Sequence, residues 1–172
     1  MAIQYGDGSN SNVGRIIQVV FSSYNGNQVV GAGSGVYHNY NNNLSCLITP
    51  KSTNSRILIL AHVCFMTYPS RDSQGIVLYK NGAIHDGARG VADGNRMRFW
   101  GSNWLYDGDN MQAIDAHFVD DPTTTSQIRY TVGMGADSGS HNTAMNRTWN
   151  YGNAQYDARG ISTLTRMEIA DR

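Results

Sequence analysis

Ser138 and His62 are the side chains whose surroundings come closest to those of nucleophilic catalysis. Ser138 lies in Gly135-Ala136-Asp137-Ser138-Gly139, and His62 lies in Ala61-His62-Val63-Cys64. A serine nucleophile needs a histidine base, a carboxylate that orients this base, and donors for the oxyanion. The residues around Ser138 depart from the Gly-Asp-Ser-Gly-Gly run of serine proteases, and no aspartate has a motif that marks it as the orienting group. We therefore predict no catalytic residue and no enzyme activity.

Metal ligation is the second chemistry that the side chains could support. Asp115 and His117 are two residues apart on an expected strand, so they share one face. No His-x-His or His-x-x-x-His spacing is present, which argues against zinc. The loops at 7–12 and 107–110 contain Asp and Asn, but neither has the glutamate that closes an EF-hand. Gly31-Ala32-Gly33-Ser34-Gly35 lacks the spacing of a dinucleotide-binding turn. We expect no metal and no cofactor, and calcium at either acidic loop stays open.

Aromatic side chains gather in two stretches, beside Asn, Asp and Gly. A sugar ring stacks on Trp or Tyr next to polar donors, and aromatic residues are also enriched in protein interfaces. We favour core and interface roles, with contact to a host-surface glycan or receptor as the alternative. The candidate contact residues are Trp100, Trp104, Tyr106, Trp149 and Tyr151.

The charge composition excludes several classes of partner. The chain has 13 basic and 13 acidic residues, and its arginines are scattered, so nothing marks a surface for nucleic acid or anionic lipid. The longest apolar run, 57–61, is far shorter than the ~20 residues of a membrane-spanning helix. The first residues lack the basic and apolar regions of a secretion signal. We expect no nucleic-acid partner and no membrane insertion.

The elements that position these side chains are predicted to be strands. The chain has 19 Gly and 17 Asn, which suit tight turns, and no 12-residue window has a helical apolar pattern. The prediction is all-β, in one domain that covers 14–172. The expected strands are 14–21, 27–31, 34–40, 44–49, 56–66, 75–80, 97–101, 112–119, 127–134, 144–149 and 160–169.

Two segments resemble β-hairpins. Apolar runs flank Asp120-Asp121-Pro122-Thr123-Thr124-Thr125-Ser126, and a similar Pro/Ser/Thr loop at 50–55 separates two other strands. We interpret the similarity of these two loops as a recurrence of Ser/Thr-rich loops at one end of a sandwich. If 50–55 is a hairpin loop, Cys46 faces Ile59 and lies on the order of 17 Å from Cys64 along the sheet. That separation exceeds disulfide geometry, so both thiols are expected to be reduced.

The order of these segments resembles that of a group of tailed-phage virion proteins. The matching segments are Gly14-Arg15-Ile16-Ile17-Gln18-Val19-Val20, the loop at 50–55 with its flanking strands, the Asp-x-Pro-Thr-Thr-Thr-Ser loop, and Gly160-Ile161-Ser162-Thr163-Leu164-Thr165-Arg166-Met167-Glu168-Ile169. Proteins of this group contain jelly rolls of the C1q/TNF type. The resemblance implies a jelly-roll β-sandwich that forms a homotrimer in the virion, after assembly in the host cytoplasm.

Within this class of virion proteins we rank an outer capsid decoration protein of a tailed phage first, bound to the major capsid protein or a tail component, because the chain is short, is expected to be globular from residue 14, and lacks the coiled-coil or β-helical shaft of a fibre polypeptide. The first alternative is a receptor-binding head or small tail-fibre component, with loops 85–96 and 133–143 as contact sites for a glycan or protein. The second is a hydrolase that acts on the host surface. Strand 56–66 is apolar on both faces, which independently predicts a subunit contact.

Residues 1–13 have the polar, glycine-rich composition of an extended N-terminal arm. Ile3 and Tyr5 alternate on one side of such an arm. An extended segment adds to an exposed sheet edge through main-chain hydrogen bonds, with alternate side chains in pockets. We therefore predict that Ile3 and Tyr5 dock the domain onto its virion partner or a neighbouring subunit.

Overall fold

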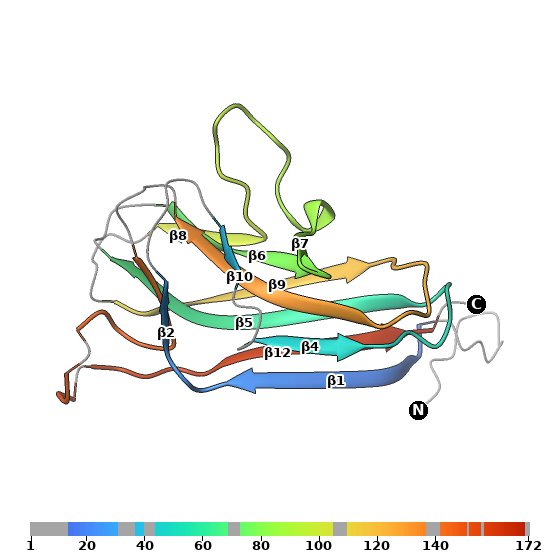
Figure 1. Ribbon diagram of the computed structural model, residues 1–172, viewed down its shortest axis with the longest axis horizontal. Helices are drawn as coiled ribbons and strands as arrows, with labels where there is room; N and C mark the ends of the chain where they lie inside the picture. Colours follow the sequence, from blue (N-terminus) through green and yellow to red (C-terminus); the bar gives the residue numbers. More distant parts are fainter. Residues whose placement is uncertain are drawn as a thin grey trace, which may run out of the picture.

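The computed structural model describes residues 14–30, 37–39, 44–68, 73–104, 110–136, 142–150, 152–155 and 157–170. Within these ranges every regular element is a strand, except the 3-10 turn η1 (Asp86–Ala88). The strands form two curved sheets that pack face to face (Figure 1). No helix in this described part is long and apolar enough to cross a bilayer. The prediction of an all-β protein is confirmed.

The first sheet, sheet A, is organised around the long strand β5. One edge of β5 pairs with β9, and the other edge pairs first with β12 and then with β11. The outer edge of β12 pairs with β1, and that of β11 pairs with β2, all antiparallel. The strands of sheet A are β1 (Ile16–Tyr24), β2 (Gln28–Val30), β5 (Arg56–Tyr68), β9 (Gln112–Asp120), β11 (Asn142–Met145) and β12 (Ser162–Ile169).

The second sheet, sheet B, is organised around β10 and β6, which pair over most of their lengths. The outer edge of β10 pairs with β4 and then β3, and the outer edge of β6 pairs with β7 and β8. The strands of sheet B are β3 (Tyr37–Asn39), β4 (Ser45–Ile48), β6 (Ser73–Lys80), β7 (Ala83–Ile84), β8 (Gly101–Trp104) and β10 (Ile128–Ala136).

The connections between the sheets identify the fold as a jelly roll. In chain order the principal strands are β1, β4, β5, β6, β8, β9, β10 and β12. In sheet A the strands β1, β12, β5 and β9 lie side by side in that order, and they are the first, last, third and sixth of the eight. In sheet B the order is β4, β10, β6 and β8, which are the second, seventh, fourth and fifth. Strands therefore alternate between the sheets in the doubled Greek-key order of a jelly roll. The predicted jelly-roll β-sandwich is confirmed.

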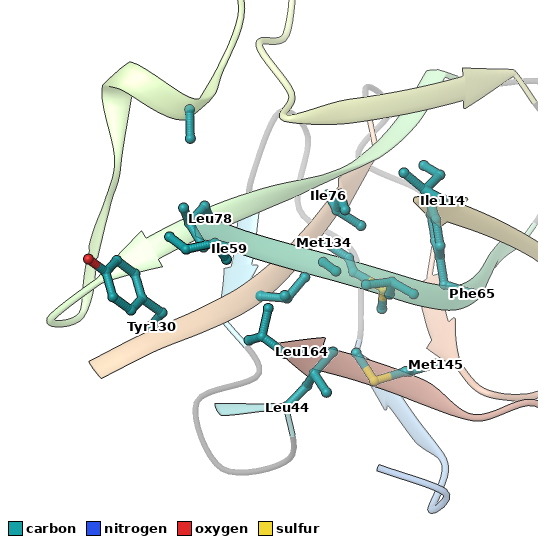
Figure 2. Close-up of a cluster of buried hydrophobic side chains, with 14 of the residues drawn as sticks. Leu44, Ile59, Phe65, Ile76, Leu78, Ile114, Tyr130, Met134, Met145 and Leu164 are labelled. Carbon is teal, nitrogen blue, oxygen red and sulfur yellow. The ribbon is translucent and has the colours of Figure 1, made fainter. Parts of the chain in front are cut away.

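The core lies between the sheets and follows the period of two that strands impose. Alternate residues of β5, such as Ile57, Ile59 and Val63, are fully buried and meet side chains from β6 and β10. Leu164 of β12 joins them from the neighbouring strand. Figure 2 shows Ile59 and Leu164 with other buried side chains, among them Leu78 and Met134, in the space between the two layers. The β-branched and aromatic composition of these strands suits this half-buried, pleated setting.

The two predicted hairpins are wrong in their pairing. β9 and β10 flank the Asp-x-Pro-Thr-Thr-Thr-Ser loop but belong to different sheets, and so do β4 and β5 around 50–55. Ile48 lies opposite Ile128, and Ile57 lies opposite Asp120, so both loops cross between the layers at the same end of the sandwich (Figure 1). A Pro/Ser/Thr turn satisfies its own backbone in a crossing as well as in a hairpin. The interpretation that such loops recur at one end is confirmed.

Cys46 therefore does not face Ile59. It lies on β4 opposite Tyr130 of sheet B, whereas Cys64 lies on β5 of sheet A. Both cysteines are free thiols in the structure. The reasoning from a shared hairpin was wrong, because the two strands belong to different layers.

Three element boundaries also differ from the prediction. The strand expected at 97–101 begins only at Gly101, and the one expected at 144–149 runs from Asn142 to Met145. It ends there because Asn146 has a φ of 59°, which breaks the extended backbone. The irregular stretch expected at 133–143 is wrong in its first part, since β10 continues to Ala136 and its residues 133–136 are all buried.

Candidate functional site

The outer face of sheet A points away from the core of the sandwich. On β5 the even-numbered residues point away from the core, and the same alternation applies to odd-numbered residues of β1, β9 and β12. The strand register places Val19, Met167, Leu58 and Val119 in one row across the four strands. All four are apolar.

The next row adds Phe21 and Leu60, with Thr165 between them and His117 beyond. We call Val19, Phe21, Leu58, Leu60, Val119 and Met167 the apolar face. Phe21 is 60% exposed, Val19 57% and Val119 42%. Because water contacts large apolar groups on four adjacent strands, this is a contiguous patch and not a set of scattered residues.

A polar cluster borders the apolar face on the same side of sheet A. His62 Nδ1 lies 2.8 Å from Asp115 Oδ1, across the β5–β9 pair. Its other ring nitrogen, Nε2, lies 3.4 Å from the Sγ of Cys64, two residues further along β5. The structure thus supplies His62 with the orienting carboxylate that the sequence analysis did not identify. Thiol, imidazole and carboxylate form a continuous chain of contacts.

Cys64 lies where β12 succeeds β11 along the edge of β5. Its backbone N–H donates to Ser162 Oγ at 3.0 Å, and its thiol also lies 3.5 Å from the carbonyl oxygen of Ile161. Gly160 packs directly against it, because a Cβ at Gly160 would lie 2.8 Å from the Cβ of Cys64. Burial raises the pKa of the Cys64 thiol. This direction is opposite to that of the activated thiol of a cysteine hydrolase, whose pKa is lowered.

Cys64 is not among the functional residues predicted from the sequence, because both cysteines were considered there only as disulfide partners. The signal was present in His62-x-Cys64, because a spacing of two on a strand puts both side chains on one face. Ser138, the other half of the hydrolase interpretation, lies outside the described residues. Asp115 and His117 do share the outer face of β9, as expected, but Asp115 contacts His62.

A second polar cluster lies inside the sandwich and is structural. The buried carboxylate of Asp120 accepts hydrogen bonds from Lys80 Nζ at 2.7 Å, from His85 Nε2 at 3.0 Å and from the Tyr130 hydroxyl. Burial alone would raise the pKa of Asp120, but the bonds from Lys80 and Tyr130 outweigh it and lower the pKa. For Tyr130, burial and the same carboxylate raise the pKa. The cluster fixes the end of β9 against β6 and β10.

Arg166 of β12 is fully buried beside this cluster. Its Nη2 donates to the carbonyl oxygen of Tyr130 at 2.7 Å, and its guanidinium lies 5.8 Å from the centre of the Tyr130 ring. Burial lowers the pKa of Arg166 to about 10. The contacts connect the two layers through a cation and an aromatic ring.

The predicted aromatic contact residues are dispersed where the structure describes them. Trp100 packs against the core, with its Nε1 donating to the carbonyl oxygen of His117. Trp149 stacks on Tyr68 at a centroid distance of 4.5 Å and covers the outer side of β5. Trp104 is 58% exposed on β8 at the edge of sheet B.

The other predicted contact residues, Tyr106 and Tyr151, and the predicted docking residues Ile3 and Tyr5, lie outside the described residues. So do the loop at 7–12 and the aspartates of the loop at 107–110.

Comparisons with known proteins give structural likenesses without a family. No family model matches the chain, and no curated protein matches it. Solved structures of infectious bursal disease virus are similar to it: the Gx strain with a TM-score of 0.43 and 16% identity over 89% of this chain and 37% of that one. For the Gt strain the TM-score is 0.44 with 13% identity, over 92% and 39%. For the VP2 subviral particle it is 0.40 with 14% identity, over 95% and 39%. The chain spans less than two fifths of the length of these chains.

Proposed function

We propose that the protein is a non-enzymatic structural subunit of a virus particle and that it assembles with copies of itself through the apolar face. The observation that carries the proposal is the row of Val19, Met167, Leu58 and Val119 across four adjacent strands of sheet A, β1, β12, β5 and β9. A sheet with one face on the core normally presents polar side chains on the other. An apolar second face is stable in water only when another surface covers it.

Self-association is the simplest way to cover this face. The six residues of the face are uncharged, so they do not select a charged partner, and the polar residues that border it, His62 and Asp115, contact one another at 2.8 Å. The resemblance of the quoted segments to phage virion proteins gives the proposed assembly as a homotrimer. The finer role that we propose is an outer capsid decoration protein of a tailed phage, whose other partner is the major capsid protein or a tail component.

The proposal excludes catalysis on chemical grounds. Among the described residues, the group nearest to a catalytic triad is Cys64, His62 and Asp115, and its thiol is buried against Gly160 and Ile161. A hydrolase needs an accessible nucleophile with oxyanion donors beside it. The carbonyl oxygen of Ile161, which faces the thiol, would repel an oxyanion.

A receptor-binding head is the second candidate, and Trp104 favours it. This side chain is 58% exposed on β8 at the edge of sheet B. An exposed indole is suited to stack on a sugar ring. Loop 85–96 projects from the sandwich and offers a further contact surface (Figure 1). On this alternative, Trp104→Ala abolishes binding to host-cell glycans, whereas a decoration protein binds none.

The experiment has two parts. Light scattering on the purified chain is expected to give three times the 18.9 kDa of one chain. An antibody against the chain, applied to intact particles in electron microscopy, is expected to label the shell. Label at the tail tip would replace the decoration role by the receptor-binding role. A monomeric chain whose antibody labels no particle would refute the proposal.

A further inference from the structure

The contacts of His62 determine which of its ring nitrogens is free to bind another group. A carboxylate only accepts hydrogen bonds, so the Nδ1 that lies 2.8 Å from Asp115 Oδ1 must carry the ring proton. The Nε2 atom then presents a lone pair, and it presents this lone pair toward Cys64 Sγ. A carboxylate that holds a histidine in this way is the usual outer partner of a metal-binding imidazole.

The distance between the two potential ligand atoms fits one metal ion. Zinc binds cysteine sulfur at about 2.3 Å and histidine nitrogen at about 2.05 Å. With 3.4 Å between Sγ and Nε2, an ion at both bond lengths makes an S–Zn–N angle of about 103°, near the tetrahedral value of about 109°. The distance between the two atoms is therefore compatible with chelation of one ion.

Gly160 packs against the thiol, and a second sulfur-containing side chain, that of Met111, lies close to the same glycine. Gly160 has no side chain, and a Cβ there would lie 3.0 Å from Cys64 Sγ and 3.1 Å from the methyl carbon of Met111. Sulfur ligands select thiophilic ions such as Zn²⁺ and Cu⁺ over Mg²⁺ and Ca²⁺.

We propose that Cys64 and His62 form a binding site for a thiophilic metal ion, with Asp115 as the positioning residue that orients the imidazole. Cys64 Sγ and His62 Nε2 are the two protein ligands, and water occupies the remaining positions. No group of three or more His, Cys, Asp or Glu side chains in the described ranges could hold a metal ion. The site therefore has two protein ligands of these types, and the ion reaches them from the side of His62, whose side chain is 41% exposed. It does not depend on the proposed virion role.

The test is a titration of the full, reduced chain with Zn²⁺ against a chromophoric chelator, without oxygen. The wild-type chain is expected to bind one equivalent. Cys64→Ser and His62→Gln are each expected to weaken binding at least 100-fold. Asp115→Asn keeps both ligands and is expected to weaken binding by about 10–100-fold, the usual effect of an outer-shell partner.

The chain offers a matched control for each ligand. Cys46→Ser removes the other thiol, and His117→Gln removes another histidine of the same sheet face, so both are expected to bind Zn²⁺ as the wild type does. Co²⁺ provides a readout that misfolding cannot imitate: a thiolate-to-cobalt absorption band present with the Cys46→Ser chain and absent with the Cys64→Ser chain. Lack of one-equivalent binding by the wild type, or undiminished binding by the Cys64→Ser chain, would overturn the proposal.

Discussion

Replacing the two most exposed residues of the apolar face tests whether sheet A is an assembly surface. The variant is Val19→Thr with Phe21→Thr. Threonine is β-branched and favours strands, so both positions of β1 retain a residue with high strand propensity. Both side chains point away from the core, so the fold of the single chain should change little. A thermal melt at low protein concentration, where subunits are apart, is expected to match the wild type within a few degrees.

The loss of association can be estimated from exposure. A phenylalanine side chain buries on the order of 200 Å², so the 60% exposure of Phe21 leaves about 120 Å² for a partner to cover. At about 25 cal/mol per Å², that area contributes about 3 kcal/mol. Threonine retains part of the area, and Val19→Thr adds a smaller loss, so the double variant loses about 3 kcal/mol per subunit. This corresponds to roughly a 100-fold weaker association.

Sedimentation velocity over a dilution series measures this change directly. The control is Val91→Thr, because Val91 is 90% exposed but lies between η1 and β8, away from sheet A. The control chain is expected to associate as the wild type does, which separates the effect of this face from that of surface hydrophobicity in general. Equal association of the double variant and the wild type would refute the assignment of the interface.

Three further predictions concern stability and attachment. Tyr130→Phe leaves the buried Asp120 carboxylate with one donor fewer and is expected to lower the free energy of unfolding by about 1.5–3 kcal/mol in urea titration; an unchanged midpoint would contradict this. Folding lowers the pKa of Asp120, so the ionised carboxylate contributes to the free energy of unfolding above its unfolded pKa of about 3.9, and this contribution is lost as pH falls through the folded value. Thermal stability is therefore expected to decline below about pH 4. The variant Asp120→Asn is expected to flatten that decline. Deleting residues 2–12, or changing Ile3 and Tyr5 together to Ser, is expected to leave the melt unchanged but prevent co-sedimentation with particles that lack the protein; normal incorporation would place attachment on the body of the domain.

The sequence predicts the strands of this protein well and their partners poorly. Alternation of apolar residues is a local signal, so β5, β9, β10 and β12 were located within a few residues. Pairing depends on whether the chain turns back or crosses to the other layer. Pro122 and the hydroxyl residues after it are compatible with both, which is why two crossings were taken for hairpins. The resemblance supplied the jelly-roll order that local patterns could not.

The same limit applies to the candidate sites. The apolar face was anticipated from β5 alone, because Leu58 and Leu60 alternate with core residues. Its continuation through Val119 and Val19 depends on register, which no single strand encodes. Asp115 lies 53 positions from His62 in the sequence, so only the β5–β9 pairing brings its carboxylate to the imidazole.

The position of β12 has a consequence for how the protein is made. Of the strands described, β12 is the last to leave the ribosome, yet it lies between β1 and β5 in the middle of sheet A. Until it is synthesised, those two strands cannot be joined, and each presents an unpaired edge that invites pairing with other chains. Productive folding must therefore wait for residues 162–169 and then close contacts between distant parts of the sequence, which makes it slow. Protection of the nascent chain during that interval is a requirement that the topology imposes on the cell.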